Sequence, residues 1–278
     1  MKLGLGTVQF GQVYGVSNVR GQVPAAEVRA ILERAAEGSI GVLDTAANYG
    51  EAEGVLGAHD LSRFRIVTKT IGLNHGLDAV IARARQSVKT LGRVDLLLVH
   101  AAGDLLGPGG EQYWNALRKL KEDGTVGGIG ISTYVADDPA ALAARFRPDA
   151  VQVPFSLLDQ RLLADGSLAR LKELGVEIHA RSLFLQGLLF LPPLPEKLRF
   201  AAPLLEAVRV RIAQAGSTPL AAALGFVRSR REIDVGLIGV TGVSELDEIL
   251  AAAAQPLPDL DWAACAQTDE TVLTPSRW

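Results

Sequence analysis

The sequence has 278 residues, a length that can bury a large core and is ordinary for one α/β barrel of about 250 residues. Its formal net charge is −3 and it has no basic tract, which argues against a nucleic-acid-binding surface. No apolar run approaches the ~20 residues that a membrane helix needs, which argues against a transmembrane helix. Its one cysteine, Cys265, excludes an intrachain disulfide, and no apolar signal-peptide core follows Met1, so we expect a cytoplasmic protein.

Short β-rich runs alternate with longer amphipathic runs along the chain. In the first half, we predict strands over 3–8, 41–45, 65–69 and 94–100. Each is followed by a helix, over 25–37, 51–57 (a short one), 78–91 and 112–122 respectively. In the second half, we predict strands over 126–132, 150–155, 177–183 and 235–240. The first two are followed by helices over 139–146 and 167–174, and the third by two helices over 203–215 and 219–228. A last helix, with Ser244 as its N-cap, follows the fourth strand and ends at residue 253.

Eight strand–helix units follow one another without the composition of a domain linker. Alternating strands and helices predict a parallel sheet, and eight units in this length predict a single α/β domain over 1–278, a (β/α)8 TIM barrel. The alternative, an open doubly wound sheet, carries a glycine-rich turn from the first strand into a helix. Gly4-x-Gly6 does not lead into a helix in that way, and we therefore reject a Rossmann domain. Three long connections, over 9–23, 101–111 and 184–202, follow strand C-terminal ends, where barrel active sites form.

Four polar residues lie at or just beyond the ends of three consecutive predicted strands. Asp44 ends the second strand, and Tyr49 follows shortly after it. Lys69 ends the third strand and His100 the fourth. A charged lysine at the end of a buried strand needs a partner, because an unpaired buried charge is costly, and Asp44 on the neighbouring strand can supply it. Taken singly, these residues also fit a turn, packing or a buried structural histidine, but their joint placement favours a functional site.

The four residue types suit proton transfer. A tyrosine hydroxyl has a pKa of about 10 and exchanges protons poorly at neutral pH, but a neighbouring ammonium stabilises the phenolate form. A carboxylate keeps that lysine charged and oriented, and a histidine donates a hydrogen bond to a carbonyl oxygen. Together these groups can protonate an oxygen as a hydride arrives at the adjacent carbon.

Several segments resemble, in the same order, those of the aldo-keto reductase superfamily. They are Gly4-Leu5-Gly6-Thr7, Asp44-Thr45-Ala46-Ala47-Asn48-Tyr49-Gly50, Thr68-Lys69-Thr70, Leu97-Leu98-Val99-His100 and Gly128-Ile129-Gly130-Ile131-Ser132. The resemblance covers essentially the whole chain. It implies an NAD(P)-dependent oxidoreductase in which Tyr49 is the general acid/base, Lys69 and Asp44 tune it, and His100 orients the carbonyl.

The resemblance also implies a nicotinamide cofactor, NADP(H) in most of the family, bound across the barrel mouth without a Rossmann domain. Ser132 and Gln152 match the residues that hold the nicotinamide amide, and Thr133 stands where the family usually has asparagine. The segment Arg181-Ser182-Leu183-Phe184 matches the one that stacks on nicotinamide and wraps the diphosphate. The implied cofactor-binding set is Thr7, Asp44, Ser132, Thr133, Gln152, Arg181, Ser182, Phe184, Gly239, Thr241 and Glu245.

Two regions depart from the family pattern. Arg181 replaces the usual aromatic stacking residue, and because a cation beside oxidised nicotinamide is unfavourable, it either alters cofactor affinity or serves an anionic substrate. Gly239 and Glu245 occupy positions where the family usually has basic residues for the 2′-phosphate of NADP(H). A glutamate repels a phosphate and can accept from a ribose hydroxyl, although it also simply suits a helix N-terminus. NAD(H) or dual use is therefore possible beside NADP(H).

We expect an enzyme that moves hydride between nicotinamide and the carbonyl carbon of a small aldehyde, ketone or sugar. The alternative is a non-catalytic, redox-sensing nicotinamide-binding module on the same fold, which Arg181 and the altered loop favour. A lyase or isomerase is disfavoured because the sequence lacks clustered carboxylates and a phosphate-binding glycine loop after the seventh strand. His59, His75 and His179 lack metal-ligand spacing, so we expect no metal site, and the resemblance allows a monomer or a homodimer.

Overall fold

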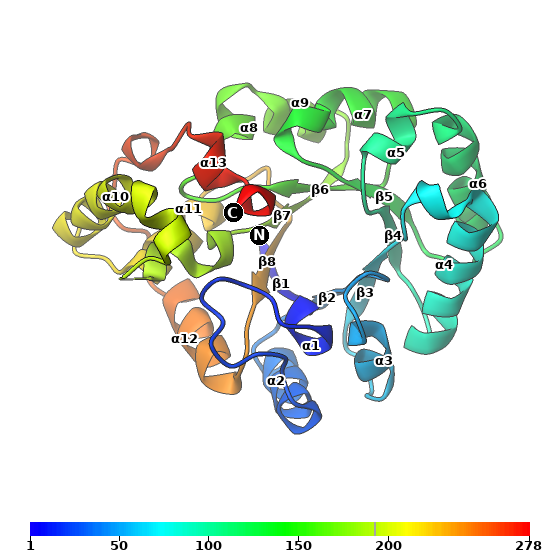
Figure 1. Cartoon of the computed structure of the whole chain (residues 1–278), viewed down its shortest axis with the longest axis horizontal. Coiled ribbons are helices and arrows are strands. Elements are labelled where there is room, and N and C mark those ends of the chain that lie inside the picture. The colour runs from blue at the N-terminus through cyan, green and yellow to red at the C-terminus, as the bar shows by residue number, and fades with distance from the viewer. Residues whose placement is uncertain (192) are drawn as a thin grey trace.

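The computed structural model describes residues 1–191 and 193–278 and shows a closed barrel of eight parallel strands ringed by helices (Figure 1). The strands are β1 (Lys2–Gly6), β2 (Val42–Asp44), β3 (Arg65–Lys69), β4 (Leu96–Val99), β5 (Ile129–Ser132), β6 (Ala150–Pro154), β7 (Glu177–Arg181) and β8 (Val235–Gly239). Each strand pairs with the next one in the chain, and β8 pairs with β1. The predicted (β/α)8 TIM barrel is confirmed, and the open doubly wound sheet is excluded because the sheet closes on itself.

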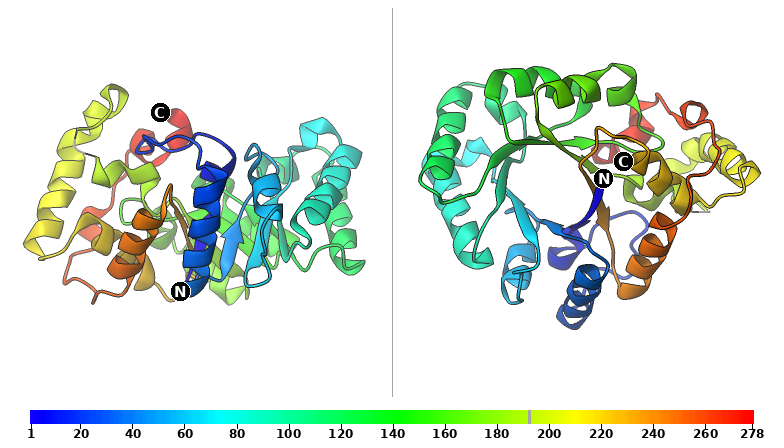
Figure 2. Two further views of the ribbon diagram at one scale, coloured as in Figure 1. Left: turned by 90° about the horizontal axis from the view of Figure 1, so that it is seen from below. Right: turned by 180° about the vertical axis from the view of Figure 1, so that it is seen from behind.

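Helices cover the outside of the barrel, and the two termini lie at opposite ends of its axis (Figure 2). The ring consists of α2 (Ala25–Glu37), α3 (Ala52–Gly57), α4 (Leu77–Leu91), α6 (Gly110–Glu122), α7 (Pro139–Phe146), α9 (Ser167–Glu173), α10 (Ala202–Gln214), α11 (Pro219–Arg228) and α12 (Val243–Ala253). Shorter helices include α1 (Val8–Gly11), α5 (Gly103–Leu106), α8 (Arg161–Ala164), α13 (Glu270–Leu273) and the 3-10 helices η3 (Leu185–Phe190) and η4 (Glu196–Ala201). Among the described residues, every helix is too short or too polar to span a bilayer.

Two sequence predictions are wrong in their details. Ser244 is not the N-cap of the last helix, because α12 already begins at Val243 and Gly242 is its N-cap. Glu27 of α2 accepts a hydrogen bond from the Val243 backbone N–H at 3.0 Å. The first free backbone N–H of this helix is therefore capped by a side chain that is distant in sequence. The first strand is also shorter than predicted, because α1 begins just after it. The other seven strands lie within their predicted ranges.

One apolar core lies on each face of the sheet, outside and inside the barrel. Strands β4, β5 and β6 are buried along their whole length, as expected of parallel strands that are covered on both faces. The larger core packs the helices against the strands. Because side chains alternate along a strand, every second residue faces the barrel interior. The smaller core lies there and consists of Val42, Val67, Leu96, Leu98, Ala150, Val235 and Leu237.

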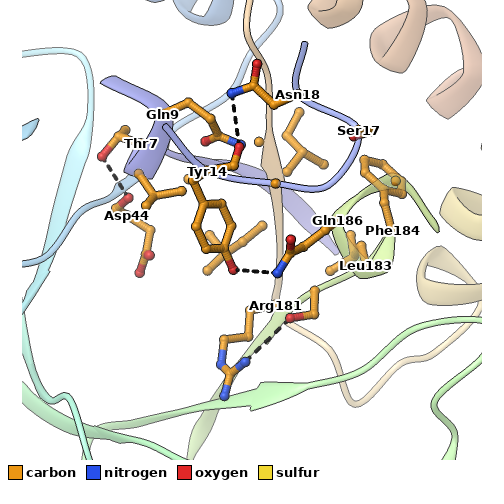
Figure 3. A pocket seen from close by; sticks show the side chains of 18 of the residues that line it. Thr7, Gln9, Tyr14, Ser17, Asn18, Asp44, Arg181, Leu183, Phe184 and Gln186 are labelled. Carbon is orange, nitrogen blue, oxygen red and sulfur yellow. Dashed lines mark hydrogen bonds between the residues drawn. The ribbon is translucent and has the colours of Figure 1, made fainter. Parts of the chain in front are cut away.

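A cavity of about 650 Å³ opens at the C-terminal ends of the strands. Its walls include residues from two of the three predicted long connections, those after β1 and after β7, whereas the connection over 101–111 contributes none. Figure 3 shows Tyr14 and Gln186, one from each connection, meeting across the cavity above Arg181. The barrel therefore places its candidate site at the end predicted from the sequence.

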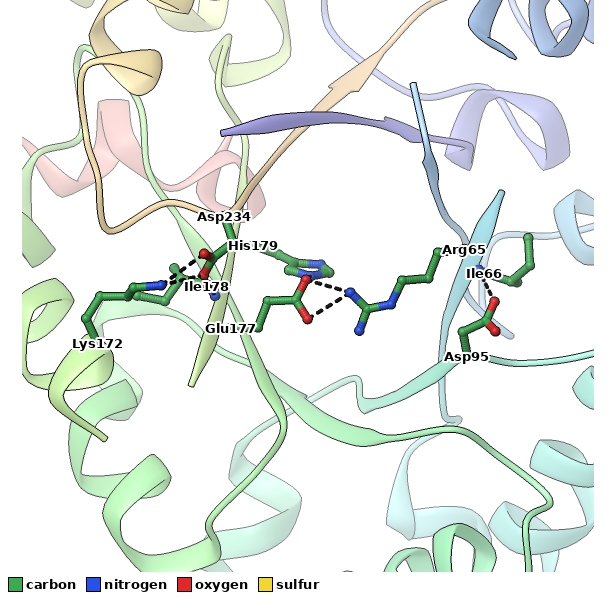
Figure 4. A network of polar contacts seen from close by, with 8 residues as sticks. All are labelled: Arg65, Ile66, Asp95, Lys172, Glu177, Ile178, His179 and Asp234. Carbon is green, nitrogen blue, oxygen red and sulfur yellow. Dashed lines mark hydrogen bonds and ion pairs between the residues drawn. The ribbon is translucent and has the colours of Figure 1, made fainter. Parts of the chain in front are cut away.

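Aspartates stabilise the opposite, N-terminal end of the barrel in a repeated manner, and Figure 4 shows two of them. The aspartate just before β4, β6 and β8 donates its backbone N–H to the carbonyl of an isoleucine in the preceding strand, and its carboxylate accepts the backbone N–H of that isoleucine. This two-way bond fixes the register of each strand pair. The pairs are Asp95 with Ile66, Asp149 with Ile129, and Asp234 with Ile178.

A buried histidine lies at the same end. His179 is fully buried, and its Nε2 lies 3.0 Å from the Glu177 carboxylate, which also pairs with Arg65 Nη1 at 2.6 Å (Figure 4). Burial opposes the charge of Glu177, but the hydrogen bonds from His179 and Arg65 lower its pKa to about 2. This histidine therefore has a structural role.

We expect Glu177→Gln to destabilise the protein by about 1–2 kcal/mol at pH 7, because the partly exposed ion pair is lost. A carboxylate with a lowered pKa contributes stability above its unfolded-state pKa and loses that contribution as the pH falls. The difference between wild type and variant in the free energy of urea unfolding should therefore shrink between about pH 5 and pH 2. Glu173→Gln, at an exposed position at the end of α9, is the control. A difference that is constant with pH contradicts this account.

Candidate active site

Strand alternation explains why the polar side chains meet. Each lies on the interior-facing side in or just beyond its strand, at the level where the apolar filling of the barrel gives way to the cavity. The cavity can therefore be lined by polar groups while a layer of apolar side chains lies directly below them. Asp44, Lys69, His100 and Gln152 each lie two residues beyond an apolar interior residue, namely Val42, Val67, Leu98 and Ala150.

Lys69 and Asp44 form a buried ion pair. The side chain of Lys69 is 1% exposed, and its Nζ lies 2.5 Å from Asp44 Oδ1. The ammonium also donates to the Thr45 carbonyl at 3.0 Å, and Gln152 Nε2 donates to Asp44 Oδ2 at 2.7 Å. Burial alone disfavours a charged lysine, but the Asp44 carboxylate and Tyr49 outweigh it and raise the pKa of Lys69. Lys69 is therefore a permanently charged ammonium fixed at the base of the cavity.

Tyr49 is the third member of this network. Its hydroxyl lies 3.3 Å from Lys69 Nζ, and it lines the cavity. A close backbone approach holds its loop in place, because a Cβ at Gly11 would lie 1.8 Å from the Tyr49 carbonyl oxygen. Gly50 adopts a φ of +55°, and a Cβ there would lie 2.3 Å from the Gly11 carbonyl oxygen. Contact between α1 and this loop thus fixes the tyrosine above the lysine.

His100 is the fourth member. Its ring meets the Tyr49 ring edge-on with centroids 5.9 Å apart, and it lines the cavity. Its backbone N–H donates to Thr70 Oγ1 at 3.3 Å, and Nδ1 is buried without a hydrogen-bond partner among the described residues. Burial, reinforced by the Lys69 charge, lowers the pKa of His100 to about 4. The imidazole is therefore neutral at pH 7 and can donate one hydrogen bond toward an oxygen in the cavity.

The structure brings most of the implied cofactor-binding residues to the same cavity. Thr133 is the exception, because its N–H and hydroxyl both donate to the Gln152 carbonyl and its side chain is buried away from the cavity. Its carbonyl oxygen instead accepts from Arg181 at 2.9 Å. The residues that line the cavity are Thr7, Asp44, Ser132, Gln152, Arg181, Ser182, Phe184, Gly239, Thr241 and Glu245.

Carboxylates dominate the end of the cavity next to α12. Glu245 accepts the Thr241 backbone N–H at 2.7 Å and the Thr241 hydroxyl at 2.8 Å. Glu248 also lines this end. Because Glu27 also accepts the Val243 N–H, two of the backbone donors at this helix start, those of Thr241 and Val243, are engaged by the protein's own carboxylates.

Some lining residues were not identified from the sequence. Tyr14, Gln9 and Gln186 all line the cavity. Burial and the nearby Tyr49 raise the pKa of Tyr14. The signal that could have found them is their place in two of the long connections, but no motif singles them out within those loops. Glu27 was also missed, because it reaches α12 from a helix 216 residues away in sequence.

Comparisons with known proteins agree with this geometry. The model of the Aldo/keto reductase family matches residues 2–270. An aldo-keto reductase from Mycolicibacterium smegmatis and a glyoxal reductase from Bacillus subtilis are each 31% identical to this chain, over 160 and 158 residues, or 52% of this chain. Each match covers 54% of the relative, so the chain spans about half the length of these curated relatives. An aldo-keto reductase structure from Bacillus halodurans, in its holo form, has the same fold, with a TM-score of 0.76 and 19% identity over 100% of this chain and 93% of that one.

Proposed function

Because the chain belongs to the Aldo/keto reductase family, we propose that it reduces the carbonyl group of a small aldehyde, ketone or sugar with a nicotinamide cofactor, using Tyr49 as general acid/base. The observation that carries this proposal is the Tyr49 hydroxyl at 3.3 Å from the Nζ of a buried, ion-paired Lys69. The glyoxal reductase among its relatives supports a carbonyl substrate. The prediction of a cytoplasmic monomer or homodimer stays a prediction.

Proton delivery falls to Tyr49. The ammonium of Lys69 stabilises negative charge on the tyrosine oxygen after the proton has left it. Asp44 accepts a hydrogen bond from Gln152, keeps the Lys69 ammonium charged, and holds it beside the Tyr49 hydroxyl. The neutral His100 donates a hydrogen bond to the same carbonyl oxygen and fixes its position beside the tyrosine hydroxyl. The site therefore supplies both a proton and a binding group for the oxygen that becomes an alcohol.

The cavity suits an extended nicotinamide cofactor, which supplies the hydride when bound. Ser132 and Gln152 would hold its amide beside the Tyr49 end, and Ser182 and Phe184 would flank its diphosphate. At the far end, a Cβ at Gly239 would meet the Gln9 amide at 2.8 Å, so a larger residue there would have to displace the Gln9 side chain. Gln9 Oε1 is buried without a hydrogen-bond partner among the described residues, which leaves an acceptor for a bound ligand.

We further propose that the enzyme prefers NAD(H) to NADP(H). The Glu245 and Glu248 carboxylates line the end of the cavity where a 2′-phosphate would lie, and like charges repel. The guanidinium of Arg20 lies next to Gly242 and brings one cation to this helix start. Glu27 lies beside it, so the local balance remains acidic. A ribose hydroxyl, in contrast, can donate to Glu245.

Fluorescence titration tests this preference. We expect wild type to bind NADH more tightly than NADPH, and Glu245→Gln to shift the ratio of the two Kd values about tenfold toward NADPH, because one repelling charge is removed. Asp247→Asn removes a carboxylate from the same helix, where it pairs with Arg34 outside the cavity, and should leave the ratio unchanged. Tighter binding of NADPH by wild type would contradict the proposal.

The second candidate is a redox-sensing module that binds the cofactor without turnover. Arg181 in place of an aromatic residue is the observation that favours it. Turnover of 4-nitrobenzaldehyde with NADH and with NADPH, measured side by side, separates the candidates. Steady consumption of either cofactor supports the enzyme, whereas saturable binding with no turnover of any carbonyl compound supports the sensor.

A further inference from the structure

Arg181 is the interior-facing residue at the end of β7, two positions beyond the buried His179. Its guanidinium extends past the end of β6 and donates from Nη2 to the Thr133 carbonyl, just beyond β5, at 2.9 Å. The group also lies over the Tyr134 ring, 4.5 Å from its centroid, and Nη1 lies 3.4 Å from Ser182 Oγ. The arginine is thus held in one position from three sides and still lines the cavity.

The charge of Arg181 has no carboxylate partner within the described part of the chain. Its hydrogen bonds go to a carbonyl and a hydroxyl oxygen, and it belongs to none of the ion pairs found there. The other cation at the cavity, Lys69, is by contrast fully matched by Asp44. Arg181 is half-buried and lines the cavity, so its unused N–H groups face the space that a ligand would occupy. They are available to an anion that enters the cavity.

Arg181 lies within electrostatic reach of the reacting end. Its charge contributes to the lowered pKa of His100, after burial and Lys69, and it acts on Tyr14 as well. Arg181 lines the cavity, and Figure 3 shows it below the Tyr14 hydroxyl and the Gln186 amide. These two neutral groups meet at 3.4 Å and can supply further hydrogen bonds to a ligand. His100 and Arg181 line the same cavity, so one molecule can place its carbonyl oxygen beside His100 and extend toward Arg181.

We propose that Arg181 is a substrate-binding residue that selects carbonyl compounds carrying a carboxylate. This inference rests on the proposed function, and it names the substrate class. A guanidinium presents parallel N–H groups that match the two oxygens of a carboxylate. One arginine flanked by neutral groups balances a single negative charge, whereas a phosphate with about two charges calls for more cations. Arg181 thus binds the substrate rather than stacking on the cofactor.

A matched substrate pair tests the proposal. 4-Carboxybenzaldehyde and its methyl ester differ in charge but present the same aldehyde. We expect wild type to favour the acid, and Arg181→Gln to lower kcat/KM for the acid by about 10- to 100-fold, mainly through KM, because a hydrogen-bonded charge pair is lost. The ester should change by less than about twofold. Arg181→Lys keeps the positive charge but loses the paired N–H groups of the guanidinium. Its kcat/KM for the acid should therefore lie between those of wild type and Arg181→Gln.

Two outcomes overturn the proposal. The first is that Arg181→Gln lowers kcat/KM equally for the acid and the ester, or binds NADH more weakly than wild type. Either result would assign Arg181 to the cofactor. The second is that Arg181→Gln leaves kcat/KM unchanged for both substrates. Calorimetric binding of 4-carboxybenzaldehyde in the presence of NAD⁺, which cannot donate a hydride, gives a readout independent of turnover. Binding that weakens in Arg181→Gln while wild type shows no reduction of either aldehyde would uphold the carboxylate site and reject the proposed reductase function.

Discussion

Tyr49→Phe is expected to lower kcat/KM for aldehyde reduction by about 1,000-fold and to leave NADH binding unchanged. The variant retains the ring that meets His100 but loses the hydroxyl that lies 3.3 Å from Lys69 Nζ. No other hydroxyl is placed beside that ammonium in the described structure, because its remaining contacts are the Asp44 carboxylate and the Thr45 carbonyl. Steady-state kinetics and a fluorescence titration of NADH on the same preparations provide the two readouts.

Tyr113→Phe is the matched control for the loss of a tyrosine hydroxyl. Tyr113 is fully buried, hydrogen-bonds to Thr70 Oγ1 and does not line the cavity. It should keep activity within a few-fold of wild type, although some stability is lost with the hydrogen bond, about 1 kcal/mol. Activity of Tyr49→Phe that equals that of Tyr113→Phe would show that the proton comes from another group.

Lys69→Met is expected to lower kcat/KM by a factor similar to that of Tyr49→Phe and, in addition, to destabilise the folded protein. The Tyr49 hydroxyl loses the ammonium that stabilises its negative charge. The Asp44 carboxylate remains buried with Gln152 as a partner but without a counter-ion. Breaking a buried pair in this way costs about 3 kcal/mol, which chemical denaturation can measure.

The double variant Asp44→Asn/Lys69→Met separates the two effects. Removing both charges leaves no unpaired charge at this position, so most of the stability lost in Lys69→Met should return. Activity should not return, because the ammonium is still absent. Recovery of turnover together with stability would mean that the pair serves the fold alone and that Lys69 has no part in proton transfer.

Local patterns were sufficient to predict the barrel and the four-residue cluster. The helices over 25–37, 139–146 and 219–228 and the strand over 65–69 begin and end where the sequence predicts them. The cluster followed from one physical rule, since parallel strands finish at the same end of a barrel and a buried lysine requires a carboxylate. Contacts within an element, or between neighbouring elements, determine these features.

Features that depend on distant contacts were not predicted. The start of α12 is satisfied by Glu27, which belongs to a helix near the N-terminus, so the local serine signal at Ser244 was misleading. The position of Arg181 depends on Thr133 and Tyr134, which reach it across a neighbouring strand. Tyr14 and Gln186 meet only because two long loops fold over the barrel mouth. Nothing in a short sequence window reports such pairings.

Transfer of deuterium from NADH that is deuterated at nicotinamide C4 tests the central claim most directly. Wild-type protein, the labelled cofactor and 4-carboxybenzaldehyde would be incubated together, and the alcohol would be analysed by mass spectrometry. The account predicts an alcohol with one deuterium on its carbinol carbon from wild type and almost none from Tyr49→Phe. Unlabelled alcohol, or no alcohol from wild type with any carbonyl compound, would contradict hydride transfer at this site.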